Sequence, residues 1–166
     1  MRFLRRAAIT CILCALAETP SIAQSETQLD GSPALFAILA AMNASGYDAE
    51  LESPTNHPLR NEIRKAILAG NPASLSRLSG FIRDQRRGDW NTELSRYISF
   101  GLTSGPPPDF KAKYDLAQIP PDAASLEAMR PLLAEFWAEA GLASLWTAAQ
   151  PAYDEVIARY HEPVVT

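Results

Sequence analysis

The sequence predicts an all-α fold, an irregular bundle of about six helices with a kinked pair of C-terminal helices and a proline-rich connector. Apolar residues recur at intervals of three and four along most of the chain, the spacing that places them on one face of a helix. Three of the expected helices open with a polar residue followed by proline, and three end at a glycine. Both are common helix-boundary signals. Sustained alternation of apolar and polar residues, the pattern of a half-buried strand, does not occur in the sequence.

Residues 1–23 have the pattern of a secretory signal peptide, so we do not expect them to be part of the fold. Three arginines precede an apolar run of 11 residues, Ala7 to Ala17, and small residues precede the expected cleavage site after Ala23. A membrane-spanning helix would need about 20 apolar residues, so the run is too short to be a permanent anchor. We therefore expect export to the periplasm or to the extracellular space, with no membrane span after cleavage.

A flexible polar leader, 24–31, is expected to precede a single helical domain, 32–166. Its first four helices are amphipathic, and a capping residue precedes each of them. The expected caps are Ser32, Asn56 or His57, Asn71, and Asp89 or Asn91, and the expected stops are Gly46, Gly70 and Gly88. The expected helices cover 33–45, 58–69, 72–86 and 90–103.

Residues 105–121 predict an ordered connector without helix, because three consecutive prolines favour an extended backbone. Its four large apolar side chains are expected to pack on the helices; they are Phe110, Tyr114, Leu116 and Ile119.

The segment 122–161 is expected to form the centre of the domain, around which the rest of the chain packs, because it holds two of the three tryptophans. Its first helix should run from Ser125 to Ala140, with Asp122 as the cap and a kink or break at Pro131. Its second helix keeps one apolar face from Leu142 to Tyr160 across Pro151, which indicates one kinked helix.

Removal of the signal peptide would change the composition. The segment carries three of the 15 basic and one of the 19 acidic residues, which leaves 12 against 18 and a formal net charge of −6. Both cysteines leave with it, so the mature chain, 166 less 23 or 143 residues, contains none. Disulfides and cysteine-ligated metals are therefore excluded. An acidic chain without a basic cluster is a poor ligand for nucleic acid, and we expect no nucleic-acid partner.

No catalytic motif is present in the sequence. Glu135 and Glu139 are four residues apart and could form the acid pair of a glycoside hydrolase, but such residues are far commoner on an exposed helix face. His57 and His161 lack the spacing of a zinc site. The acidic residues within 48–52 alternate, but the glycine and distal glutamate of a calcium loop are missing. We expect no catalytic residue, metal or cofactor.

The candidate interaction surface lies on the last two helices. Aromatic residues at helical spacing more often form core than a ligand groove. The last helix, however, has some twenty residues and a length of roughly 30 Å, so its second half can extend beyond the shorter helices. The residues of this candidate surface are Trp137, Trp146, Tyr153, Val156, Ile157 and Tyr160.

Three segments carry a family resemblance: 44–65, 94–110 and 132–164. They resemble the N-terminal helical region of long, secreted, uncharacterised bacterial proteins in which a degenerate metallopeptidase-like domain follows. The resemblance implies a helical supporting region, with a protein partner or a C-terminal domain beyond it. The end of the chain at Thr166, just after the last expected helix, would fit a truncated or standalone N-terminal region. The histidine motif of the peptidase-like domain is absent from this chain, so no catalytic residue is carried over.

We therefore expect a non-catalytic, exported helical interaction or supporting module. One alternative is a prodomain or substrate-shaping fragment of a peptidase-like protein. Another is a binder of small apolar ligands through an aromatic groove, which an open cavity with exposed Trp137 and Trp146 would favour.

The cleavage site gives the first testable prediction. Protein recovered from the periplasm or medium of an expressing bacterium is expected to begin at Gln24, as measured by intact-mass spectrometry. The variant Ala23→Tyr should retain residues 1–23, because the peptidase needs a small residue before the cut. Recovery of exported wild-type protein that still begins at Met1 would contradict the prediction.

Overall fold

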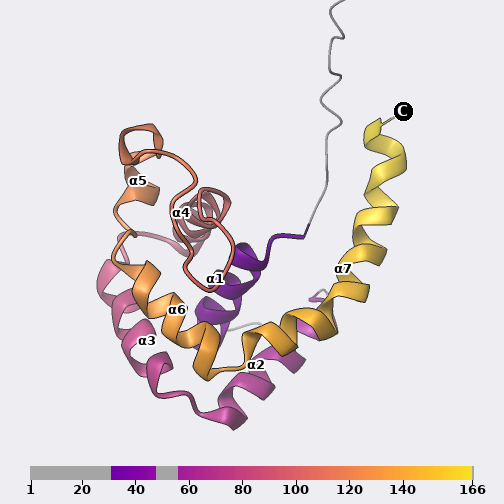
Figure 1. The fold of residues 1–166 in the computed structure, drawn as a ribbon, viewed down its shortest axis with the longest axis horizontal. Helices are drawn as coiled ribbons and strands as arrows, with labels where there is room; N and C mark the ends of the chain where they lie inside the picture. The colour runs from indigo at the N-terminus through magenta and orange to yellow at the C-terminus, as the bar shows by residue number, and fades with distance from the viewer. Residues whose placement is uncertain (1–30, 48–55, 166) are drawn as a thin grey trace, which may run out of the picture.

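The computed structural model describes residues 31–47 and 56–165. They form seven α-helices and one 3-10 helix, with no strand among these residues, which confirms the predicted all-α fold (Figure 1). The predicted signal peptide, most of the leader and the acidic positions 48–52 lie outside the described residues. The helices are α1 (Pro33–Ala44), α2 (Pro58–Gly70), α3 (Ala73–Gln85), α4 (Trp90–Leu102), the 3-10 helix η1 (Leu116–Gln118), α5 (Pro121–Ala124), α6 (Met129–Glu139) and α7 (Leu142–Val165).

The central helix of the bundle is α1, which contacts α2, α3, α4, α6 and α7. Nine of its 12 residues are buried, and it has no polar residue before Asn43. A helix that is apolar all round has to be covered on all sides. The prediction that the chain packs around segment 122–161 is therefore wrong, because α6 and α7 are part of the cover of α1.

A close crossing joins α4 to α1 at Gly101. A Cβ atom at Gly101 would lie 2.9 Å from Cδ1 of Leu35 and 3.3 Å from its Cα. Carbon atoms in contact normally lie about 3.5–4.0 Å apart, so only glycine allows the helices to meet here without displacement. The neighbouring Tyr97 and Phe100 of α4 are fully buried beside this crossing.

Several predicted helix boundaries are confirmed. Backbone N–H groups in the first turns of α1, α2 and α4 donate to the side chains of Ser32, His57 and Asp89, at 3.2, 3.3 and 3.0 Å. Gly46 follows α1 with a φ of 85°, a left-handed conformation that glycine adopts at no steric cost. Local sequence therefore determines these ends.

The predicted cap of α3 is wrong. Asn71 instead ends α2 with a φ of 44°, because asparagine tolerates the left-handed conformation better than other residues with a side chain. Pro72 takes the N-cap position of α3 and makes no side-chain hydrogen bond. The backbone N–H of Ser74 donates to Oε2 of Glu139 at 2.8 Å, so α6 supplies the missing cap.

The helix predicted from Ser125 begins later, at Met129. Asp122 lies inside the short helix α5 and is not its cap. The break expected at Pro131 occurs just before it, in the turns of 125–128, so that Pro131 lies in the first turn of α6. A proline there removes no hydrogen bond of the helix. The last helix does continue across Pro151 as predicted, and α7 bends along its length (Figure 1).

The connector between α4 and α5 packs as expected at only two of its four apolar side chains. Phe110 and Ile119 are buried, with 0% and 4% of their surface exposed. Tyr114 and Leu116 are 55% and 59% exposed, so the expectation that they pack on the helices is wrong. The connector is therefore fixed to the bundle at its middle and at its end.

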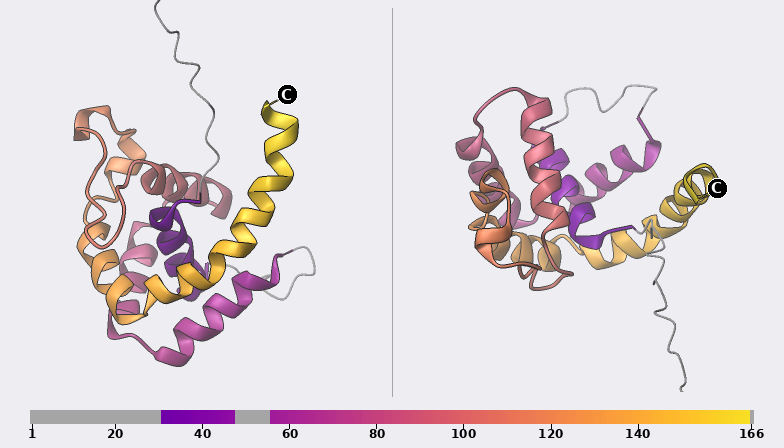
Figure 2. Two further views of the ribbon diagram at one scale, coloured as in Figure 1. Left: turned by 45° about the vertical axis from the view of Figure 1, so that its right-hand side comes forward. Right: turned by 90° about the horizontal axis from the view of Figure 1, so that it is seen from above.

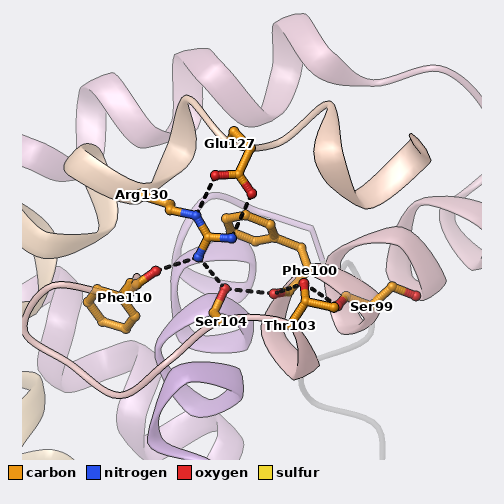
Figure 3. Close-up of polar contacts among 7 residues, drawn as sticks. All are labelled: Ser99, Phe100, Thr103, Ser104, Phe110, Glu127 and Arg130. Carbon is orange, nitrogen blue, oxygen red and sulfur yellow. Dashed lines mark hydrogen bonds and ion pairs between the residues drawn. The ribbon is translucent and has the colours of Figure 1, made fainter. Parts of the chain in front are cut away.

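Arg130 of α6 holds the middle of the connector in place (Figure 3). Its Nε and Nη2 atoms each lie 2.6 Å from a carboxylate oxygen of Glu127. Its Nη1 donates to Oγ of Ser104 at 2.8 Å and to the carbonyl oxygen of Phe110. The guanidinium also lies 4.6 Å from the ring centroid of Phe100. One side chain thus joins α6, the end of α4 and the connector.

Removal of this guanidinium should destabilise the fold. Arg130→Ala leaves the Glu127 carboxylate and the carbonyl of buried Phe110 without their partner, and we expect a loss of about 3 kcal/mol in the free energy of unfolding. Urea denaturation followed by circular dichroism measures this change. The control is Arg159→Ala, which removes an exposed ion pair with Glu155 on α7 and should change stability by less than about 0.5 kcal/mol. Equal effects of the two substitutions would contradict the role of Arg130.

Candidate ligand-binding groove

An open groove with a volume of about 430 Å³ lies among α1, α2, α4 and α7. We call it the α1–α2–α7 groove. Ligand sites in proteins commonly have volumes of about 300–1,000 Å³ and mostly apolar walls. The residues that line it are Phe36, Leu39, Ala40, Met42, Asn43, Tyr47, His57, Leu59, Arg60, Ile63, Leu94, Ile98, Ala152, Tyr153 and Val156.

The groove exists because the cover of α1 is incomplete. The helices α2 and α7 both contact α1, and the second half of α7 extends away from the bundle (Figures 1 and 2). Leu59 and Ile63 of α2 and Leu39 of α1 are therefore only half-buried, while Val156 of α7 is 39% exposed. These apolar side chains face space that a guest of matching shape can fill.

An aromatic cluster closes the groove where α7 meets α1. The ring centroids of Phe36 and Trp146 are 5.2 Å apart, and those of Trp146 and Tyr153 are 5.3 Å apart. Gly31 packs on the same indole, because a Cβ atom there would lie 2.8 Å from Cη2 of Trp146. Trp146 therefore holds the start of the domain against α7, while Phe36 and Tyr153 also line the groove.

The structure separates the residues of the predicted interaction surface. Tyr153 and Val156 line the groove, and Ile157 is half-buried on the same helix. Trp137 lies on α6, where its ring meets Phe110 edge-on with 5.9 Å between centroids. The side chain of Tyr160 lies outside the described residues. Neither Trp137 nor Trp146 lines the groove.

Polar side chains of the groove gather where α1 ends and α2 begins. Nδ2 of Asn43 donates to the carbonyl oxygen of Arg60 at 3.1 Å, and Nη1 of Arg60 donates to Oδ1 of Asn56 at 2.8 Å. His57 caps α2 in the same place. Burial raises the pKa of Tyr47, an effect that the nearby charge of Arg60 opposes, so this phenol stays protonated at neutral pH.

The side chain of Asn43 contains a hydrogen-bond acceptor to which no described residue donates. The side chain is 5% exposed, and its Oδ1 has no hydrogen-bond partner among the described residues. An unpaired buried polar atom costs about 1–3 kcal/mol. A hydrogen-bond donor that reached this end of the groove would therefore remove a cost that the empty protein carries.

The lining residues of α1, α2 and α4 were not identified from the sequence. Leu39, Ile63 and Ile98 have the spacing of ordinary core positions, and their pattern is the same whether or not another helix covers them. His57 gave only the local signal of a cap, and Asn43 was not singled out. The groove follows from how four helices meet, for which the sequence shows no direct sign.

Glu135 and Glu139 bind α3 and lie away from the groove. Glu135 pairs with Arg77, and both side chains are about half exposed. Glu139 accepts the N–H of Ser74, as described above. No residue of α3 or α6 lines the groove. Both carboxylates therefore have a structural task, the attachment of α6 to α3.

A second, buried ion pair, in addition to that of Arg130 with Glu127, is also structural. Arg96 and Glu93 of α4 are almost fully buried, with 2.7 Å between Nη2 and Oε2. Arg96 also donates to the carbonyl oxygen of Gln85 at 2.7 Å, and Glu93 accepts the N–H of Arg87 at 2.8 Å. The pair therefore joins α4 to the end of α3. Burial beside it raises the pKa of Tyr97 to about 12.

Among the residues that the structure describes, no group of three or more histidine, cysteine, aspartate or glutamate side chains is placed to hold a metal ion. Within the same residues, no helix is both long and apolar enough to cross a membrane.

Comparisons of the chain with protein-family models, with curated proteins and with solved structures returned no match. The resemblance to the region before a metallopeptidase-like domain therefore stays a prediction, and the groove is the structural feature from which a function can be proposed.

The cap that Glu139 supplies to α3 should make stability depend on pH. The N–H of Ser74 lowers the pKa of Glu139 below its usual 4.5, so its contribution is present above that value and is lost as the pH falls through the lower pKa. Glu139→Gln should therefore lower the melting temperature at pH 7, and the difference from wild type should shrink below pH 4.5. Thermal melts across this range measure it. A difference that is the same at every pH would show that the charge of Glu139 does not matter.

Proposed function

We propose that this chain is an exported, non-catalytic helical module that binds an apolar guest in the α1–α2–α7 groove. One observation carries the proposal: the bundle leaves a volume of about 430 Å³ open between apolar side chains of four helices. Protein interiors are closely packed, with few voids larger than a water molecule. An open apolar volume of ligand size is therefore the feature of this structure that most needs a function.

The contacts of the ionisable side chains support a module without catalysis. The carboxylates first considered for hydrolysis, Glu135 and Glu139, are engaged with α3. The buried charges of Arg130 and Arg96 are paired within the fold. Export is proposed from residues 1–23 alone, and the place of this region before a peptidase-like domain rests on the resemblance alone.

A protein partner on α7 is a second candidate. It is favoured by the extension of the second half of α7 away from the bundle (Figure 2) and by the exposure of Val156. Val156 also belongs to the wall of the groove, so such a partner would compete with a small apolar guest.

Binding of an uncharged apolar fluorophore tests the proposed function. N-phenyl-1-naphthylamine should bind the mature protein with an increase in fluorescence. Ala152→Trp places an indole in the groove from α7 and should weaken binding about tenfold, or by about 1.4 kcal/mol. Circular dichroism should show that the variant remains folded.

The matched control is Ala148→Trp, because Ala148 lies on the same helix but is exposed. This variant should bind the fluorophore as the wild type does. Equal affinity of all three proteins, or no binding by any of them, would contradict the groove as a binding site.

A further inference from the structure

One residue in the wall of the α1–α2–α7 groove has a buried polar atom without a partner. Asn43 lines the groove near the end of α1, and the residue is 5% exposed. Its Nδ2 donates to the carbonyl oxygen of Arg60 at 3.1 Å, while Oδ1 accepts from no described residue. Among the described residues that line the groove, no other side chain has such an atom. The groove therefore offers one acceptor that a guest can satisfy.

The contact of Nδ2 decides which kind of polar group the guest needs. The amide of asparagine has an acceptor oxygen and a nitrogen with two donor hydrogens. A backbone carbonyl oxygen can only accept, so the nitrogen has to face that of Arg60, and the oxygen is the atom left without a partner. A carboxylate or ether oxygen would meet Oδ1 as a second acceptor. The guest therefore has to donate a hydrogen bond.

The apolar wall favours a donor without a charge. Leu39, Ile63 and Ile98 surround most of the open volume, and burial of a charge beside such side chains is costly unless a charge of opposite sign accompanies it. No acidic residue is present among the described lining residues, so they supply no partner for an ammonium group. A hydroxyl group carries a donor hydrogen and no charge.

The size of the groove favours a single apolar chain over a protein helix. An α-helix is about 10 Å across and rises about 5.4 Å per turn, so a volume near 430 Å³ takes roughly one turn of such a helix. Along α1, Phe36 and Asn43 are seven residues apart, which corresponds to roughly 10 Å. That distance suits an alkyl chain of medium length.

We propose that the groove binds an uncharged aliphatic alcohol of medium chain length. The hydroxyl group donates to Oδ1 of Asn43, and the alkyl chain lies against Leu39, Ile63 and Ile98. This inference rests on the proposed function, because it names the chemical class of the guest.

A comparison of two isomers, 1-octanol and heptyl methyl ether, tests the inference. Both have the same atoms, but only the alcohol can donate a hydrogen bond. Displacement of N-phenyl-1-naphthylamine should show that 1-octanol binds about tenfold more tightly than the ether. A groove without a free acceptor would give the opposite order, because the hydroxyl group loses hydrogen bonds to water on burial. Equal or tighter binding of the ether would overturn the inference.

Asn43→Leu assigns the preference to Oδ1. The variant keeps a side chain of similar size, so it should bind the ether as the wild type does and lose the tenfold preference for 1-octanol. Unchanged binding of the ether also shows that the groove is intact. The control is Gln150→Leu, which replaces an exposed amide on α7 and should keep the preference. A preference that persists in Asn43→Leu would overturn the assignment.

Charged compounds of the same chain length complete the test. Octanoate and octylammonium should displace the fluorophore less well than 1-octanol, and tighter binding of either ion would overturn the uncharged class. Affinity should rise about fourfold for each added methylene from 1-hexanol to 1-octanol, the increment expected for burial of one CH₂ group. If the fluorophore binds but the alcohols do not displace it, the alcohol is wrong and the proposed function stands. If the fluorophore does not bind, the proposed function itself fails.

Discussion

The need to bury the almost entirely apolar helix α1 is the constraint on which the rest of the structure depends. Its alanines and large apolar residues leave it no face for solvent, so the chain has to surround it. Five helices do so, and Gly101 lets α4 approach most closely. The groove is the place where this cover is thin, since α2 and α7 both reach α1 without filling the space between them. Architecture and proposed function thus have one origin.

The two largely buried arginines Arg96 and Arg130 are paired within the fold. Arg130 and Arg96 are paired with carboxylates of their own or the adjacent helical segment and also reach backbone carbonyls. Such groups position helices and connectors, and the loss of one partner is strongly destabilising because it leaves a buried charge uncompensated.

Local chemistry made much of the fold predictable, and the errors have physical causes. Ser32 and Asp89 act as caps because their side chains serve the first turn directly. Asn71 could cap one helix or end another, and only the left-handed turn after α2 decides between these roles. The centre of the domain was predicted wrongly because the large aromatic residues of 122–161 were given more weight than the small residues of α1. Small residues are what allow five neighbouring helices to approach α1.

The candidate site was only partly predictable for a related reason. Tyr153 and Val156 were identified because the apolar face of α7 is longer than the other helices need. Leu39, Ile63 and Ile98 were not, because periodicity reports which residues face inward and says nothing about whether another helix meets them. An open space between helices is a property of tertiary packing, and no single segment encodes it.

A crystal of residues 24–166 under xenon pressure would show whether the groove is open. Xenon occupies apolar cavities without needing a polar contact. We expect a xenon atom in the groove, in contact with Leu39, Ile63 and Ile98, with the helices in the positions described. A groove closed by contact of α2 with α7, and without xenon, would contradict this expectation.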